Sequence, residues 1–252
     1  MTDNGSQDET PDILAEFATQ GVVTSLSEPS ESFDQDLWVT RMAHMAAERH
    51  ARWIIHSDTD EFWIAAGGGS LADYFRARRL VNIVEATRHD FICPPPAGGP
   101  FWQRMTVRRA HSVNSLGKPL PPKIAHRGSP RVSVTPGNHD VTGFFWPRYA
   151  SDGLEILHFP IRSREQYHQK IRIGARALAK NTRLKPWTGL TWRAESAELE
   201  QTGTTKMSEA TLLSGDAIRQ GLEDGSLLED QRLRTHLDRI FAMVASGQSP
   251  SQ

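Results

Sequence analysis

The chain alternates between segments with helical spacing of apolar residues and short, compact apolar runs. The clearest helix is predicted over residues 164–180, where Ser163 and Gln166 have the spacing of a capping box. Apolar stripes and capping residues predict further helices over residues 11–17, 34–52, 70–79, 215–223 and 229–245. Compact or alternating apolar runs predict strands over residues 21–25, 53–56, 80–87, 106–110, 123–126, 132–135 and 154–159. This order predicts an α/β fold: a mixed, Rossmann-like sheet with helices on both faces.

One apolar run ends abruptly in acidic residues. Trp53-Ile-Ile-His56 has the composition of a central strand, and Ser57-Asp-Thr-Asp-Glu61 follows directly. Ligands of open α/β sheets bind outside the carboxyl ends of the strands. The acidic segment is therefore the first candidate for a functional site.

Asp58 and Asp60 carry the candidate chemistry of that segment. In an extended chain, residues two apart point the same way, so both carboxylates would face one side. Hard oxygen ligands suit Mn²⁺ or Mg²⁺, which proteins usually hold through one or two carboxylates together with substrate phosphates. Such a metal would neutralise a diphosphate leaving group. The alternative interpretation is a solvated acidic turn that caps a helix.

Composition suggests a domain boundary near residue 195. The 252 residues suit one large α/β domain or two small ones. Beyond Trp192 the composition becomes acidic and helical. We therefore predict a domain over residues 1–195 and a helical C-terminal extension over residues 196–252, whose polar tail is frayed.

Charge and cysteine content bear on the class of partner and on the cellular location. The 29 Lys and Arg residues nearly balance the 30 Asp and Glu residues, so the global charge indicates neither nucleic acid nor a membrane as partner. Peripheral membrane contact through the basic face of residues 164–180 stays open. The single cysteine, Cys93, cannot form an internal disulfide, which favours a reducing, cytoplasmic location. No apolar run reaches the roughly 20 residues that span a bilayer, and no signal peptide is recognisable.

Three segments together resemble one known family. Trp53 to Phe62 resembles the Asp-x-Asp region of glycosyltransferase family 2-like proteins with the GT-A fold, in the group with Asp-x-Asp-Glu-Phe. Asp3 to Thr10 resembles the Asp-x-x-Ser-x-Asp-x-Thr loop that follows the second strand of that fold. Ile156 to Tyr167, with Lys170 and Gly174, resembles the His-x-Pro-x-Arg-Ser-x-x-Gln segment. The ordered set covers roughly residues 1–180, and the remaining residues match no segment of the family.

The resemblance implies a metal-dependent transferase that uses a nucleotide-sugar donor, such as a UDP- or GDP-sugar, and a saccharide, lipid or protein acceptor. It implies that Asp58 and Asp60 hold Mn²⁺ or Mg²⁺ and the donor. His158 would be a further metal or diphosphate ligand, because neutral imidazole is a competent ligand. A satisfied core histidine at a strand end is the alternative for His158.

The resemblance also implies further donor contacts. Asp3 would contact the base or ribose, although its surroundings have the composition of a disordered tail. Arg162 and Lys170 would pair with phosphate oxygens, which favour charged donors. The basic residues of 164–180 could equally form a solvated helix face.

The catalytic base is less defined by sequence. An inverting transferase needs a carboxylate or histidine to accept the proton of the acceptor hydroxyl. Asp140, in the polar turn 137–140, is the first candidate and His139 the second, with Glu85 and Asp90 as further candidates. An ordinary Asx turn is the alternative for Asp140.

Aromatic residues offer a candidate acceptor platform. Of the 7 tryptophans, four fall in loop-like stretches: Trp102, Trp146, Trp187 and Trp192. Trp146, between Phe145 and Pro147, is the best candidate for stacking on an acceptor sugar, whereas large aromatic residues usually serve to bury area.

The chain departs from the family pattern at its start. A GT-A domain opens with a strand, a helix and a second strand, whereas this chain begins in the loop that contains Asp3. Three interpretations stay open: an upstream start, completion by a partner chain, or a relative without turnover. The alternative function is therefore a non-catalytic, truncated binding or interaction module. A phosphohydrolase is disfavoured, because Phe62 stands where such enzymes usually have Thr or Val.

Overall fold

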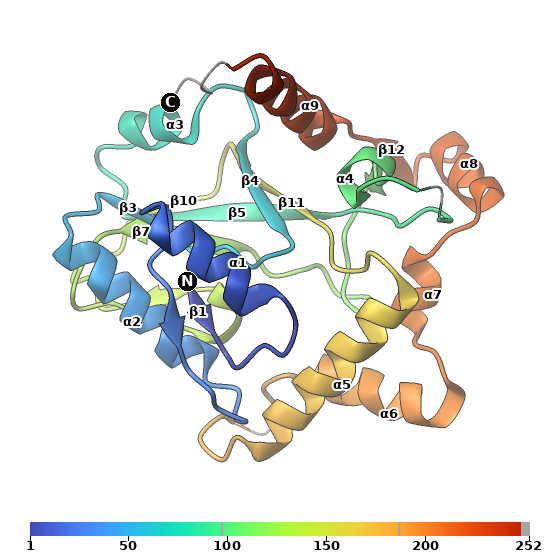
Figure 1. The fold of residues 1–252 in the computed structure, drawn as a ribbon, viewed down its shortest axis with the longest axis horizontal. Coiled ribbons are helices and arrows are strands. Elements are labelled where there is room, and N and C mark those ends of the chain that lie inside the picture. Colours follow the sequence, from blue (N-terminus) through green and yellow to red (C-terminus); the bar gives the residue numbers. More distant parts are fainter. Residues whose placement is uncertain (97, 186, 248–252) are drawn as a thin grey trace.

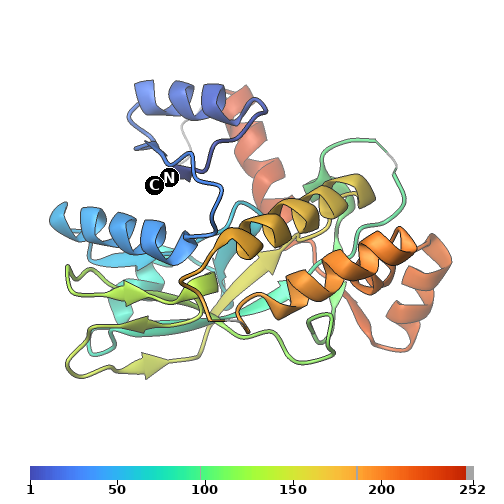
Figure 2. The same cartoon turned by 90° about the horizontal axis from the view of Figure 1, so that it is seen from below.

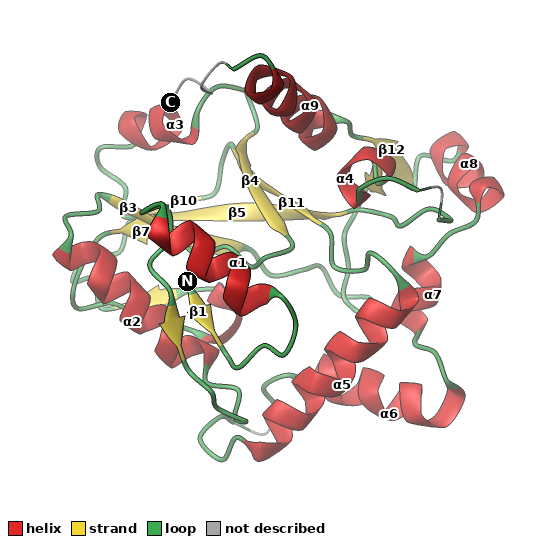
Figure 3. Cartoon of the chain, in the orientation of Figure 1, coloured by secondary structure: helices red, strands yellow, loops and turns green. Residues whose placement is uncertain are grey.

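The computed structural model describes residues 1–96, 98–185 and 187–247 and shows a mixed α/β protein (Figure 3). The main sheet has the strand order β3-β7-β5-β11-β4, with a short strand, β10 (Tyr149–Ala150), beside β5. Its five ordered strands are β3 (Trp53–Ile55), β4 (Glu61–Ala65), β5 (Ile83–Asp90), β7 (Lys123–Arg127) and β11 (Leu154–His158). β11 runs parallel to β5, and the other neighbours in this order are antiparallel. The predicted mixed sheet is confirmed.

Helices cover both faces of this sheet, as the sequence predicts. On one face, Ala43 of helix α2 (Gln35–Glu48) packs in a cluster with Ile54 and Ile83. On the opposite face, Phe75 of α3 (Leu71–Ala77) packs in a cluster with Val84. Because successive side chains of a strand point to opposite faces, the pair Ile83 and Val84 serves both layers.

The interpretation of residues 53–56 as a central strand is wrong. β3 stands at one end of the strand order and, among the described residues, pairs only with β7. Helices α2 and α3 cover it from both faces, so Trp53-Ile-Ile55 needs apolar residues on both sides although it is not central. A compact apolar run indicates that both faces of a strand are buried. It does not indicate where the strand lies within the sheet.

The second half of the chain adds helices beyond β11. α5 (Arg164–Lys180) and α6 (Leu190–Thr202) lie side by side in both views (Figures 1 and 2). They are followed by α7 (Lys206–Thr211), α8 (Gly215–Glu223), β12 (Leu227–Glu229) and α9 (Arg232–Ala245). β12 pairs with β6 (Val107–Arg109), and α4 (Phe101–Arg104) contacts α9. The predicted helical C-terminal part is confirmed for the described residues, and residues 248–252 of the expected frayed tail lie outside them.

Gly174 permits the close packing of α5 on α6. A Cβ added to this residue would lie 1.7 Å from Cζ3 of Trp192. The Trp192 ring therefore occupies space on the surface of α5 that any side chain at position 174 would take. Glycine costs about 1 kcal/mol in a helix relative to alanine, so the packing of Trp192 is the physical reason for it here.

The remaining small elements lie near the N-terminus and beside β7. β1 (Thr2–Asp3) pairs in parallel with β2 (Leu26–Ser27), and α1 (Thr10–Thr19) lies between them in the sequence. The predicted strand at 21–25 is wrong: Gly21 has φ +71° and Val22 is 68% exposed, so the segment turns at the surface. β8 (Ser133–Val134) and β9 (Val141–Thr142) form a hairpin around the short 3₁₀ turn Pro136–Asn138.

The predicted bounds of helices and strands agree with the structure for some elements and differ for others. Residues 164–180 and 215–223 form helices with the predicted bounds, and Ser163 and Ser214 cap them by accepting backbone N–H groups. Strand β4 and helices α6 and α7 were not predicted, and the predicted helix 229–245 divides into the end of β12 and α9. Within the described residues, no helix is both long and apolar enough to cross a membrane.

Candidate functional site

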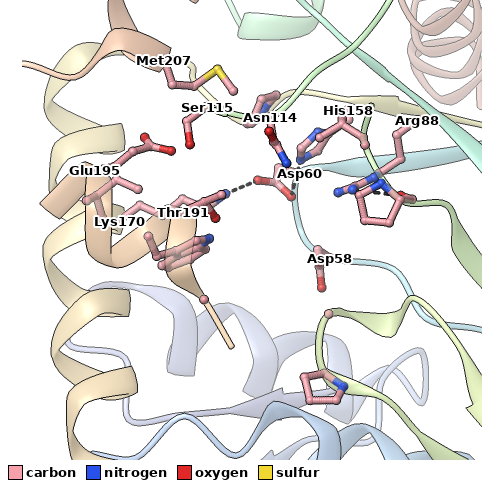
Figure 4. Close-up of a pocket in the computed structure, with 18 of the residues that line it drawn as sticks. Asp58, Asp60, Arg88, Asn114, Ser115, His158, Lys170, Thr191, Glu195 and Met207 are labelled. Carbon is pink, nitrogen blue, oxygen red and sulfur yellow. Dashed lines mark hydrogen bonds and ion pairs between the residues drawn. The ribbon is translucent and has the colours of Figure 1, made fainter. Parts of the chain in front are cut away.

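A pocket of about 540 Å³ lies between the edge of the sheet and the α5–α6 pair (Figure 4). The loop between β3 and β4 contributes Asp58 and Asp60 to its wall, and β11 contributes His158. Helix α5 contributes Lys170 and α6 contributes Glu195. Residues that are far apart in the sequence therefore share one cavity.

Lys123 balances the charge at the first aspartate. Its Nζ lies 2.5 Å from Oδ2 of Asp58 and 3.1 Å from Oε1 of Glu61, and its side chain is only 2% exposed. A buried ammonium group needs such partners, because removal from water disfavours an unpaired charge. The Asp58 side chain stays 38% exposed and faces the pocket. Gln35 and Asn138 donate hydrogen bonds to its other oxygen, at 3.3 and 3.4 Å.

The second aspartate belongs to a chain of charged groups. Nζ of Lys170 lies 2.6 Å from Oδ2 of Asp60, and Nε2 of His158 lies 3.8 Å from Oδ1. Burial alone would raise the pKa of Asp60. The charges of Lys170 and His158 and the hydrogen bond from Lys170 outweigh it and hold the pKa below its usual value. Asp60 is therefore a carboxylate at neutral pH.

Asp90 orients His158 from behind. Its Oδ1 lies 2.6 Å from Nδ1 of His158, so an ionised Asp90 requires the proton on Nδ1. In the neutral form of the ring, the lone pair is then on Nε2. A carboxylate behind a histidine is the usual outer-shell arrangement of metal-binding histidines. Asp90, predicted as a base candidate, serves here as the positioning residue for His158.

The residues predicted to hold a metal are paired with lysines in this structure. Among the described residues, no group of three or more His, Cys, Asp or Glu side chains is arranged to hold a metal ion. Asp58 and Asp60 instead face Lys123 and Lys170. Mg²⁺ and Mn²⁺ often use one or two carboxylates and complete their shell with substrate phosphates and water. Asp60 and His158, with Asp58 at the pocket surface, fit that kind of site.

The two predicted bases differ in position. His139 lines the pocket, and its Nδ1 lies 2.8 Å from the carbonyl oxygen of Pro122. Burial lowers the pKa of His139 to about 4, so the ring is neutral at neutral pH. Asp140 is exposed and lies outside the pocket lining, and its Oδ1 accepts hydrogen bonds from the Val141 N–H and the Tyr149 hydroxyl. These contacts do not form the Asx turn of the alternative interpretation, which would use the N–H two residues further on, at Thr142.

Two further predicted donor contacts also lie outside the pocket lining. Asp3 accepts hydrogen bonds from the N–H and the hydroxyl of Ser6, at 3.2 and 2.5 Å. The Arg162 guanidinium lies 5.3 Å from the ring centre of Phe101, in a cation–π contact. Neither side chain is placed beside Asp58 or Asp60, so their predicted contacts with the nucleotide and diphosphate stay predictions.

The helical wall carries a carboxylate that sequence reasoning missed. Glu195 is 5% exposed and accepts a hydrogen bond from the hydroxyl of Tyr167 on α5. Burial raises the pKa of Glu195, and the hydrogen bond from Tyr167 opposes this shift. Burial and the Glu195 charge likewise raise the pKa of the Tyr167 hydroxyl. Glu195 also falls at the predicted boundary near residue 195, which lies within helix α6.

Two lining residues have buried polar atoms that lack a partner among the described residues. They are Nε of Arg88 and Oγ of Ser115. Figure 4 shows Ser115 beside Glu195 and Arg88 on the opposite side of the cavity, near His158. Buried polar groups in proteins almost always find a partner. A polar ligand in the pocket would supply one at each side.

The aromatic candidates divide between core and pocket. Trp192 lines the pocket, whereas Trp146 lies outside its lining. Trp102 is partly buried against the core and stacks on the exposed Phe241 of α9 at a ring-centre distance of 5.4 Å. Trp192 therefore replaces Trp146 as the tryptophan best placed to contact a ligand.

The pocket residues that were not predicted differ in how recognisable they are from the sequence. Lys123 opens the apolar segment Lys-Ile-Ala-His, and a charged residue there indicates a buried ion pair. Glu195 and Ser115 sit in ordinary polar surroundings, and only the tertiary fold brings them to the pocket.

Comparison with known proteins finds no matching family model and no matching curated relative. The resemblance to glycosyltransferases consequently rests on the three sequence segments.

Proposed function

We propose that this protein is a metal-dependent glycosyltransferase that moves a sugar from a nucleotide-sugar donor to a saccharide, lipid or protein acceptor. One observation carries the proposal: Asp58, Asp60 and His158 meet in one pocket with three cations. The cations are Lys123, Lys170 and Arg88. Carboxylates that can hold a metal, beside cations that can hold phosphate oxygens, are what a metal–diphosphate group requires.

Asp58, Asp60 and His158 are the residues that would hold Mn²⁺ or Mg²⁺. A bound divalent ion neutralises charge on the diphosphate as it leaves the sugar. Lys123 and Lys170 already point their ammonium groups at the two aspartates. With donor present, the same groups can donate hydrogen bonds to phosphate oxygens, which accept them more strongly than neutral groups do.

Glu195 is the proposed base. It is the lining carboxylate for which no ion pair with a described residue is found, because Asp58, Asp60 and Asp90 face Lys123, Lys170 and His158. Its raised pKa makes it a stronger base than an exposed glutamate. It would take the proton of the acceptor hydroxyl while that oxygen bonds to the sugar carbon and the bond to the diphosphate breaks.

Release of free nucleotide from a panel of UDP- and GDP-sugars tests this proposal. We expect release that needs Mn²⁺ or Mg²⁺, from at least one donor, in the presence of mixed glycan and glycolipid acceptors. Asp60→Asn should lower the rate about 100-fold or more, as expected for loss of an electrostatic group at the reacting centre. Asp140→Asn, outside the pocket, is the matched control. Donor binding without release by the folded wild type would favour the non-catalytic module instead.

A further inference from the structure

A second feature of the surface lies away from the pocket, in the segment 143–148 between β9 and β10. Phe145 is 88% exposed and Trp146 is 72% exposed, and their rings meet edge to face. Leu80, within the connection 78–82 between α3 and β5, is 76% exposed. Single exposed apolar residues are ordinary, but large side chains exposed to this degree and grouped together usually mark an interaction site.

Hydrogen bonds hold the two segments together. Asn82 donates from its side chain to the carbonyl of Trp146 at 2.8 Å and accepts from the N–H of Arg148 at 2.6 Å. The backbone N–H of Ile83 donates to the carbonyl of Arg148 at 3.1 Å. The aromatic side chains are thus displayed from a loop whose backbone is fixed to β5.

Arginines lie in and beside the segments that hold these apolar residues. Arg148 donates to the carbonyl of Leu80 at 3.5 Å, and Arg127 donates to the carbonyls of Arg78 and Arg79 at 2.7 and 3.4 Å. Arg78 is neutralised by Asp152 at 2.9 Å. Four other arginines in this region form no ion pair with any described carboxylate: Arg52, Arg79, Arg127 and Arg148.

We propose that Leu80, Phe145 and Trp146, with Arg79 and Arg148, form a docking surface for an anionic membrane interface. These five residues are called the aromatic–arginine patch. Tryptophan favours the boundary between head groups and acyl chains, phenylalanine and leucine insert their apolar side chains there, and arginine is attracted by anionic head groups. A nucleic acid or an acidic protein would satisfy the arginines but would leave the apolar side chains of Leu80 and Phe145 without a matching surface.

The patch fits this role better than the basic face of helix α5, which the sequence suggests. Lys170 of α5 points at Asp60 in the pocket, Lys180 pairs with Glu31, and Arg164 pairs with Glu209. Three of the five Lys and Arg residues of α5 are therefore already balanced. The proposal for the patch does not depend on the proposed enzyme activity.

Vesicle flotation tests the proposal on the full chain. The probes are vesicles of phosphatidylcholine alone and of an equimolar mixture of phosphatidylcholine and phosphatidylglycerol. We expect binding to the mixed vesicles, weaker binding to the neutral ones, and weakening as salt is raised. Phe145→Ser with Trp146→Ser should reduce binding about tenfold or more, and Arg79→Gln with Arg148→Gln should also reduce it. Circular dichroism checks that each variant is folded.

Trp187→Ser is the matched control, because Trp187 is 64% exposed elsewhere on the surface. Binding of this control should equal that of the wild type. Failure of the wild type to bind the mixed vesicles would overturn the proposal, as would equal losses in the control and the patch variants. A dimer that the Phe145→Ser/Trp146→Ser variant dissociates, without vesicle binding by the wild type, would assign the patch to a second copy of the chain instead.

Discussion

Lys123 balances the charge of two carboxylates at the pocket. Its ammonium faces Asp58 and Glu61, and the Glu61 side chain is fully buried. Removal of one partner leaves buried charge uncompensated. Lys123→Met should therefore lower the free energy of unfolding by about 3–5 kcal/mol, measured by urea denaturation. Lys180→Met breaks an exposed pair with Glu31 and should change it by less than about 1 kcal/mol. Equal effects of the two substitutions would contradict this assignment.

Glu195 makes a separate prediction at the scale of a residue. Glu195→Gln should lower nucleotide release about 100-fold or more, the usual contribution of a general base, while donor affinity stays unchanged. In the wild type, the rate should fall as pH falls through the raised pKa of Glu195, and this acid limb should vanish in the variant. Glu200→Gln, on an exposed position of the same helix, is the control. Loss of donor affinity in Glu195→Gln would point to a structural role.

Residue identities in the site were only partly predictable. The sequence predicts four residues that line the pocket: Asp58, Asp60, His158 and Lys170. Local sequence signals mark the loop after β3 and the start of α5, where three of them lie. Glu195 depends on the packing of α6 against α5, which no local pattern specifies. Asp140 shows the opposite case, since a polar turn between strands has the same sequence signal whether it faces a pocket or solvent.

At the scale of elements, the contact of α5 with α6 forms the helical wall of the pocket. Gly174→Ala should force Trp192 off α5, because the added Cβ would overlap its ring. Overpacking typically costs about 1–3 kcal/mol, and the clash here exceeds the roughly 1 kcal/mol that alanine gains in a helix. The melting temperature should therefore fall. Gly215→Ala, where the glycine in α8 has open space, should leave it unchanged or raise it. A more stable Gly174→Ala protein would contradict the described packing.

Elements with strong local signals could be predicted from sequence, and those defined by long-range contacts could not. The helix of α5 has a Ser163 cap whose hydroxyl accepts the Gln166 N–H, and its predicted bounds are confirmed. Phe62-Trp-Ile64 of β4 has the composition of a strand, but its pairing partner β11 lies roughly 90 positions further along the chain, so its place in the sheet is not set locally. The end position of β3 has the same cause, because strand order is a property of the whole sheet.

At the scale of the whole molecule, buried histidines predict how stability depends on pH. Nε2 of His56 lies 2.8 Å from Nε2 of His126, joining β7 to the residue that follows β3. Burial lowers the pKa of His56 to about 3, with further lowering by the charges of His126 and Lys123, and burial also lowers the pKa of His126. Below pH 6.5, the ordinary pKa of histidine, the unfolded chain therefore binds more protons at these two residues than the folded chain does.

The stability that depends on keeping this histidine pair neutral is complete above pH 6.5. It is lost as pH falls toward the lowered pKa values of the folded state. The free energy of unfolding should therefore decrease between pH 6.5 and about 5, by up to about 1.4 kcal/mol per pH unit for each such histidine. His56→Gln should reduce this slope, and His236→Gln, at an exposed position, should not. Urea unfolding across this range measures the slope. A slope that His56→Gln leaves unchanged would exclude the pair as its source.

Calorimetric binding of UDP and GDP, with and without Mn²⁺, tests the central claim most directly. The wild type should bind at least one nucleotide in a metal-dependent manner. Asp58→Ala with Asp60→Ala should abolish that binding, and Asp140→Ala should preserve it, because Asp140 lies outside the pocket lining. Failure of the folded wild type to bind either nucleotide, or full binding by the double variant, would contradict a metal–diphosphate site at this pocket.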